Sequence, residues 1–145
     1  MSNISVIGAG GWGLALANIF SEKHNIKVWV HSEKRYKLLK ENHRNDNYLE
    51  NIELNKDIFF TMNIEEAINE SEIIIIVTPS FAFHEACENI EPYIKNEQIL
   101  VSATKGLDRK SGKTMSEVAR SVISGDLNIL TLSGPSHAEE TAKGI

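Results

Sequence analysis

Short apolar runs recur along this chain, and each is followed by a longer stretch of helix-forming residues. Six runs predict strands, at 4–7, 26–30, 58–61, 73–77, 99–102 and 129–132. Between them we expect helices at 14–20, 32–39, 63–69, 81–90 and 111–123. The run at 73–77 is continuous and β-branched, as in a strand buried on both faces of a parallel sheet. The alternation predicts an α/β fold with a doubly wound parallel sheet in the order 3-2-1-4-5-6, and one domain over residues 1–145.

The first expected strand runs directly into a glycine-rich turn. Gly8, Gly10 and Gly13 have the spacing G-x-G-x-x-G, with a strand before them and a helix after them. The first glycine permits the sharp turn, the second lets a pyrophosphate approach the backbone, and the third lets the helix pack on the strand. The amides at the start of that helix then face the anion. The pattern indicates a Rossmann-type dinucleotide site, and the alternative is a purely structural turn.

Composition narrows the function classes. Of the 145 residues, 41% are hydrophobic and 24% charged, as in soluble globular proteins, and the net charge is −5. This balance argues against nucleic-acid or anionic-membrane binding, and the five histidines show no metal-ligand spacing. Cys87 is the single cysteine and is expected to be a small core residue. Because Met1–Asn3 leaves no room for a signal peptide, we expect a cytoplasmic protein.

The residues after the second strand bear on the choice between NAD and NADP. A carboxylate that binds the ribose of NAD is usual here, but the position holds His31, followed by Ser32. His31, Ser32, Lys34 and Arg35 could all donate to a 2′-phosphate, which favours NADPH or use of both cofactors. The alternative is that His31 only ends the strand while Glu33 reaches back to the ribose.

Two further segments follow strands and carry polar side chains. Lys105, between a threonine and a glycine, is placed either to project a cation toward a ligand or to lie solvated in a loop. Ser136 and Glu139 have the spacing of a capping box and predict a further helix. His137 beside them is either an acid or base or, more often for such a histidine, incidental.

Together these motifs resemble a known family. GAGGWG, Tyr48-Leu49 in an Asn-rich loop, VTPS, ATKGL and LSGPSHAEE are similar to the bacterial NAD(P)-dependent glycerol-3-phosphate dehydrogenases. The resemblance covers the whole chain and implies reversible reduction of dihydroxyacetone phosphate to sn-glycerol 3-phosphate, which feeds phospholipid synthesis.

The resemblance also assigns residues to the site. Gly11 stands where serine is commoner, and Lys105 would orient and polarise the substrate, because a cation stabilises a developing alkoxide. The substrate contacts would be Lys105, Gly134 and Ser136. The candidate cofactor-binding residues, from motif and resemblance together, are Gly8, Gly10, Gly11, Trp12, Gly13, His31, Ser32, Tyr48, Pro79, Lys105 and Ala138.

Members of this family continue into a helical substrate domain that this chain does not include. That domain would supply the lysine that transfers the proton and the groups that grip the phosphate, so we expect the chain alone to bind nucleotide weakly and to turn nothing over. Whether the complete protein is a homodimer stays open. The alternatives are another two-domain dehydrogenase, of the hydroxyacyl-CoA, sugar-acid or nucleotide-sugar type, or a non-catalytic NAD(H)-sensing module.

Overall fold

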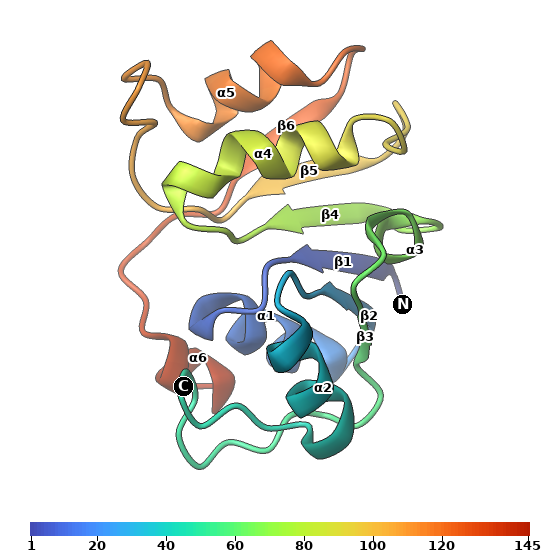
Figure 1. Ribbon diagram of the computed structural model, residues 1–145, viewed down its shortest axis with the longest axis vertical. Coiled ribbons are helices and arrows are strands. Elements are labelled where there is room, and N and C mark those ends of the chain that lie inside the picture. Colours follow the sequence, from blue (N-terminus) through green and yellow to red (C-terminus); the bar gives the residue numbers. More distant parts are fainter.

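A computed structural model describes residues 1–145 and contains a six-stranded parallel sheet in the order β3-β2-β1-β4-β5-β6 (Figure 1). Its strands are β1 (Asn3–Ile7), β2 (Asn25–Trp29), β3 (Phe59–Thr61), β4 (Ile73–Ile76), β5 (Ile99–Ser102) and β6 (Asn128–Thr131). Both the α/β class and the strand order predicted from the sequence are confirmed. Because β1 and β4 are neighbours in the middle of the sheet, the chain reverses its direction of winding between them.

Helices cover both faces of the sheet. Their bounds are α1 (Gly11–Ser21), α2 (Glu33–Asn42), α3 (Ile64–Ile68), α4 (Ser80–Ile90), α5 (Met115–Val122) and α6 (Ala138–Ala142). The residues of α1 and α2 pack into one hydrophobic cluster, and those of α3, α4 and α5 into another. None of these helices has the length and apolar character that crossing a bilayer requires.

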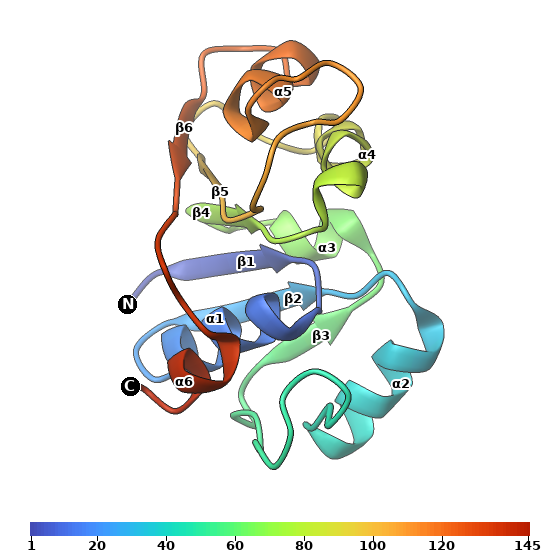
Figure 2. The same cartoon turned by 90° about the vertical axis from the view of Figure 1, so that its left-hand side faces the viewer.

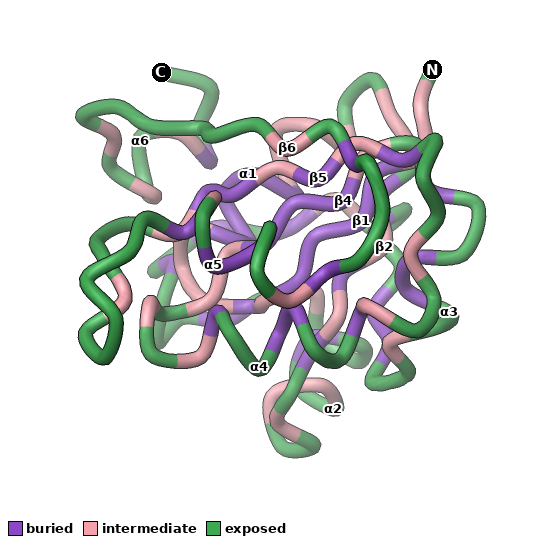
Figure 3. Tube along the Cα trace, turned by 90° about the horizontal axis from the view of Figure 1, so that it is seen from above, coloured by how far each residue is buried: buried purple, intermediate pink, exposed green.

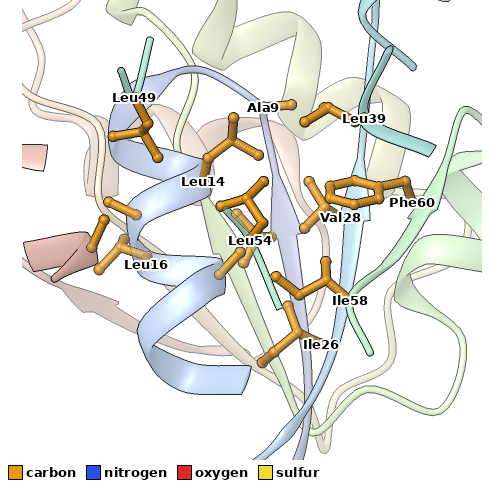
Figure 4. Packing of buried hydrophobic residues seen from close by; sticks show 14 of the residues in the cluster. Ala9, Leu14, Leu16, Ile26, Val28, Leu39, Leu49, Leu54, Ile58 and Phe60 are labelled. Atoms are coloured by element: carbon orange, nitrogen blue, oxygen red, sulfur yellow. The ribbon is translucent and has the colours of Figure 1, made fainter. Parts of the chain in front are cut away.

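The sheet separates the two hydrophobic clusters. Around α1, Leu14 points toward Val28 of β2, and Leu16 lies on the other side of the helix in the same cluster (Figure 4). On the opposite face, Phe83 of α4 is fully buried in the second cluster. Figure 3 shows the buried positions concentrated on the strands and the exposed ones on the outer turns. The apolar runs of the sequence thus form a core that holds the carboxyl ends of β1, β2, β4 and β5 in fixed positions.

The chain returns across the molecule after β6. From the outer edge of the sheet it runs back to the other half, where α6 packs on α1 (Figure 2). The side-chain amide of Asn18 donates a hydrogen bond to the Ala142 carbonyl at 3.2 Å. This return brings the segment around Ser136 to the glycine-rich turn.

Two of the helix starts predicted from the sequence are wrong. The helix expected from Ser111 begins at Met115, because Ser111 is held in a turn by Asp108, whose carboxylate accepts its hydroxyl and its amide. These two hydrogen bonds hold the pKa of Asp108 below its ordinary value. The capping box expected at Ser136 is absent, because extended backbone at His137 delays α6 to Ala138.

The capping box that does form is at α5. The Thr114 hydroxyl accepts the Glu117 amide at 3.3 Å, and the Glu117 carboxylate accepts the Thr114 amide at 2.8 Å. We therefore expect Thr114→Ala to lower the free energy of unfolding by about 1 kcal/mol in urea denaturation. Ser136→Ala is the matched control and should change it by less than about 0.5 kcal/mol. Equal losses in the two variants would contradict the assignment of the caps.

Cys87 lies in the second hydrophobic cluster and is fully buried. Burial raises the pKa of its thiol to about 12, since an apolar surrounding disfavours the thiolate. The thiolate is the nucleophilic form, so this thiol is chemically inert in the folded chain. Its position agrees with the small core residue expected from the sequence.

Candidate functional site

The glycine-rich turn is shaped by contacts that leave no space for side chains. Gly8 has φ of +123°, and a Cβ there would lie 2.7 Å from the carbonyl oxygen of Val77, just after β4. A Cβ on Gly13 would overlap the Gly8 carbonyl oxygen, so α1 packs directly on the turn. A Cβ on Gly10, in contrast, would meet no atom within 4 Å. The turn is therefore closed on the side of the sheet and open at Gly10.

The helix that follows presents its N-terminus to this open side. Gly10 is the N-cap residue of α1, it provides no side-chain cap, and the first turn carries no acidic residue. The amides of Gly11, Trp12 and Gly13 have no backbone acceptor within the chain. These free donors and the helix dipole make the region beside Gly10 suitable for an anion.

Two hollows meet at Gly10. The first has a volume of about 340 Å³ and reaches over the ends of β1 and β2 to His31 and Tyr48. We name it the adenosine-side hollow, because the sequence predicts the ribose of a dinucleotide beside His31. The lysine-side hollow has a volume of about 400 Å³ and extends past Trp12 to Lys105. Gly10, Val77, Thr78 and Pro79 line both of them. An extended ligand with an anionic centre at Gly10 would place one end in each hollow.

The adenosine-side hollow is lined by aromatic and basic side chains. The imidazole of His31 lies against the indole of Trp29, with ring centroids 5.6 Å apart. Arg35, in the first turn of α2, donates a hydrogen bond to the Tyr48 hydroxyl at 2.6 Å. Its guanidinium carbon lies 4.6 Å from the centre of the same ring. Flat surfaces and a cation thus share one wall of this hollow.

In the lysine-side hollow, one cation lies beyond the start of α1. The ammonium of Lys105 lies 5.8 Å from the centre of the Trp12 ring and donates a hydrogen bond to the Ser136 carbonyl oxygen at 3.4 Å. Lys105 is exposed and forms no ion pair within the chain. Its charge is therefore available to a ligand.

Most of the residues predicted from the sequence lie together around these hollows. The lining residues among them are Gly8, Gly10, Gly11, Trp12, Gly13, His31, Tyr48, Pro79, Lys105, Ser136 and Ala138. Ser32 lines neither hollow, because its hydroxyl caps α2 by accepting the Arg35 amide at 3.4 Å. Gly134 also lies outside both and lines a neighbouring hollow that includes Lys105.

The site also contains features that sequence reasoning missed. Arg35 and Tyr48 are thirteen positions apart, and no local pattern indicates that they touch. The Thr78 hydroxyl oxygen is buried and has no hydrogen-bond partner, although Thr78 lines both hollows. Phe81, at the start of α4, is 81% exposed beside the adenosine-side hollow. For Phe81, its position directly after the VTPS motif was the one feature of the sequence that could have indicated a place at the site.

These features fit a dinucleotide. Its pyrophosphate would lie at the free amides of α1, where Gly10 leaves space for it. The two hollows would then receive its two ends, and the unpaired Thr78 hydroxyl would find an acceptor or donor on the ligand. Binding at the carboxyl ends of strands, where the winding reverses, is the general rule for open parallel sheets.

Comparison with known proteins identifies the family. Residues 3–145 match the family model described as NAD-dependent glycerol-3-phosphate dehydrogenase N-terminus. The chain is 79% identical over 145 residues to glycerol-3-phosphate dehydrogenase [NAD(P)+] of Brachyspira hyodysenteriae, and 40% identical over 147 residues to that of Fusobacterium nucleatum. All of the chain is covered in both cases, but only 44% of each relative, so it spans less than half of their length.

The fold leads to the same group of proteins. The crystal structure of glycerol-3-phosphate dehydrogenase from Coxiella burnetii superposes with a TM-score of 0.89 at 28% identity, covering 99% of this chain and 44% of that one. The resemblance noted in the sequence motifs is therefore confirmed. The chain belongs to the NAD-dependent glycerol-3-phosphate dehydrogenase family and corresponds to its N-terminal part.

Proposed function

We propose that residues 1–145 form the cofactor-binding domain of an enzyme that reversibly reduces dihydroxyacetone phosphate to sn-glycerol 3-phosphate with NADPH or NADH. The observation that carries this proposal is the unpaired Lys105 ammonium in the lysine-side hollow, directly beyond the phosphate-binding turn. A domain that only senses nucleotide has no need of a cation at this position. The 79% identity to a curated dehydrogenase supports the same choice.

Different residues of the chain bind different parts of the cofactor. The amides of α1 beside Gly10 hold the pyrophosphate, and His31 and Tyr48 flank the adenosine. Trp12, Lys105 and Ala138 surround the nicotinamide end in the lysine-side hollow. When bound, the reduced nicotinamide supplies the hydride that the ketone carbon of the substrate accepts.

Lys105 acts on the substrate oxygen. Its ammonium donates a hydrogen bond to the carbonyl, polarises it, and stabilises the negative charge that develops on that oxygen. Ser136, whose carbonyl already holds the Lys105 ammonium, and Gly134 contact the substrate from the segment after β6. The proton that completes the alcohol comes from a lysine in the part of the complete enzyme that lies outside this chain.

NADPH is the favoured cofactor of the two. Glu33, the acidic residue nearest the end of β2, is paired with Lys37 at 3.1 Å, one turn along α2. Glu33 does not line the adenosine-side hollow, where a carboxylate would bind the ribose in an NAD enzyme. His31 and Arg35 line the hollow in its place.

Calorimetric titration with NADH and NADPH at fixed ionic strength tests the proposal. We expect both nucleotides to bind the chain, with NADPH the tighter. Tighter binding of NADH would indicate that Glu33 binds the ribose, as a carboxylate does in NAD enzymes. Absence of binding, both by the chain and by a version extended to the length of its relatives, would overturn the proposal.

A further inference from the structure

Fewer residues after β2 are placed to contact the adenosine ribose than the sequence suggests. The Ser32 hydroxyl caps α2, and the Glu33 carboxylate is paired with Lys37. Neither residue lines the adenosine-side hollow, and Lys34 does not line it either. Of the residues that follow β2 directly, His31 and Arg35 are the ones that line it.

Arg35 carries a charge that nothing in the chain neutralises. It forms no ion pair with any carboxylate, including Glu85 of α4, which lines the same hollow. Its partner is the neutral Tyr48 hydroxyl at 2.6 Å, and the guanidinium lies over the Tyr48 ring. A guanidinium has five N–H donors, so most of them stay free after this single bond.

The geometry points to Arg35 as the residue that binds the 2′-phosphate of NADP, with Tyr48 as the positioning residue that holds its guanidinium at the hollow. A guanidinium binds a phosphate through two parallel hydrogen bonds, and one that is already held in place loses little freedom on binding. The inference rests on the proposed function, because it requires the adenosine end of a dinucleotide in this hollow.

The experiment compares two probes that differ only in the phosphate concerned. The 145-residue chain is titrated calorimetrically with adenosine 2′,5′-bisphosphate and with adenosine 5′-monophosphate. The measured quantity is the ratio of the two affinities. We expect the bisphosphate to bind about tenfold more tightly or better, as a charge-assisted phosphate contact implies.

Three variants isolate the role of Arg35. Arg35→Leu should reduce the affinity ratio to near one while the monophosphate binds as before. Tyr48→Phe keeps the ring but removes the hydroxyl, and should give an intermediate ratio. Lys40→Leu is the control. The Lys40 ammonium likewise lies over a tyrosine ring, 5.4 Å from the centre of Tyr36, but Lys40 does not line the hollow. It removes the same charge and should leave the ratio unchanged.

The outcomes separate this inference from the proposed function. An unchanged ratio in Arg35→Leu, an equal loss in Lys40→Leu, or no preference in the parent chain would overturn the role of Arg35 while leaving nucleotide binding intact. Failure of both probes to bind would overturn both. Circular dichroism of each variant shows whether it has folded, and Arg35→Lys, which keeps the charge but not the fork, should restore the ratio only in part.

Discussion

Gly13→Ala is expected to destabilise the chain by about 2 kcal/mol or more in urea denaturation, and to abolish nucleotide binding. Alanine favours a helix over glycine by about 1 kcal/mol, which on its own would stabilise α1. The added methyl group, however, would overlap the carbonyl oxygen of Gly8, and both groups belong to the backbone. Neither can rotate away, so α1 must shift from β1 and the steric cost exceeds the gain in helix propensity.

Gly10→Ala is the matched control in the same turn. Its methyl group would meet nothing within 4 Å, and its φ of −79° suits any residue. Stability should therefore change by less than about 1 kcal/mol. Nucleotide affinity should still fall by about tenfold or more, because the methyl group occupies the space of the pyrophosphate. If both variants lost stability equally, the packing assigned to the turn would be wrong.

Lys105→Met is expected to lower kcat/KM for dihydroxyacetone phosphate by about 10² to 10³-fold, the effect of removing one preorganised donor to the developing oxyanion. The assay needs the chain extended to the length of its relatives. A fusion to the remaining part of the Brachyspira hyodysenteriae protein provides it, since the two chains are 79% identical over the shared part. Nucleotide affinity should change by no more than about fivefold, as for a single exposed charge.

Lys110→Met is the control for that experiment. Lys110 lies exposed in the turn before α5 and lines neither hollow, and its replacement removes the same charge. It should leave kcat/KM within about twofold of the parent. An unchanged kcat/KM in Lys105→Met would show that the cation has no part in the reaction. Absence of turnover in the parent fusion would favour a nucleotide sensor over an enzyme.

The sheet could be predicted from the sequence because each strand is specified locally. The run from Ile74 to Ile76 is buried as its composition requires. Every strand begins and ends within about two residues of its apolar run. The glycine spacing then fixes where the winding starts. Given alternating strands and helices, the strand order follows from the handedness of the crossovers and the position of the fingerprint.

Helix starts were less predictable, because the sequence motif of a capping box occurs at more positions than form one. Thr114 and Ser136 both have glutamate three positions later, and the motif alone does not distinguish them. What separates them is the backbone: Thr114 precedes a helix whose apolar residues Met115, Val118 and Ala119 are buried, whereas extended His137 stands between Ser136 and α6. Tertiary packing therefore decides which of the two motifs forms a capping box.

The site was predictable where its residues follow strands, and not where loops converge. Gly10, His31 and Lys105 each stand directly after a strand, so the sheet brings them to one edge. The contact of Arg35 with Tyr48 depends on how the loop after α2 folds back, a conformation that no short pattern encodes. The same loop passes Gly11, where a Cβ would lie 3.3 Å from the Tyr48 carbonyl oxygen, so glycine leaves room for it where serine would crowd it.

The packing of α6 on α1 sets an order of events during synthesis. α1 ends at Ser21, whereas α6 begins at Ala138 and contributes the buried Ala142 to the same hydrophobic cluster. At 5–20 residues per second, the ribosome delivers this partner roughly 6 to 23 s after α1 has emerged. Through that interval the outer side of α1 is uncovered. The first helix to be made is therefore among the last to be enclosed, and the lysine-side hollow, which Ser136 and Ala138 line, is completed late.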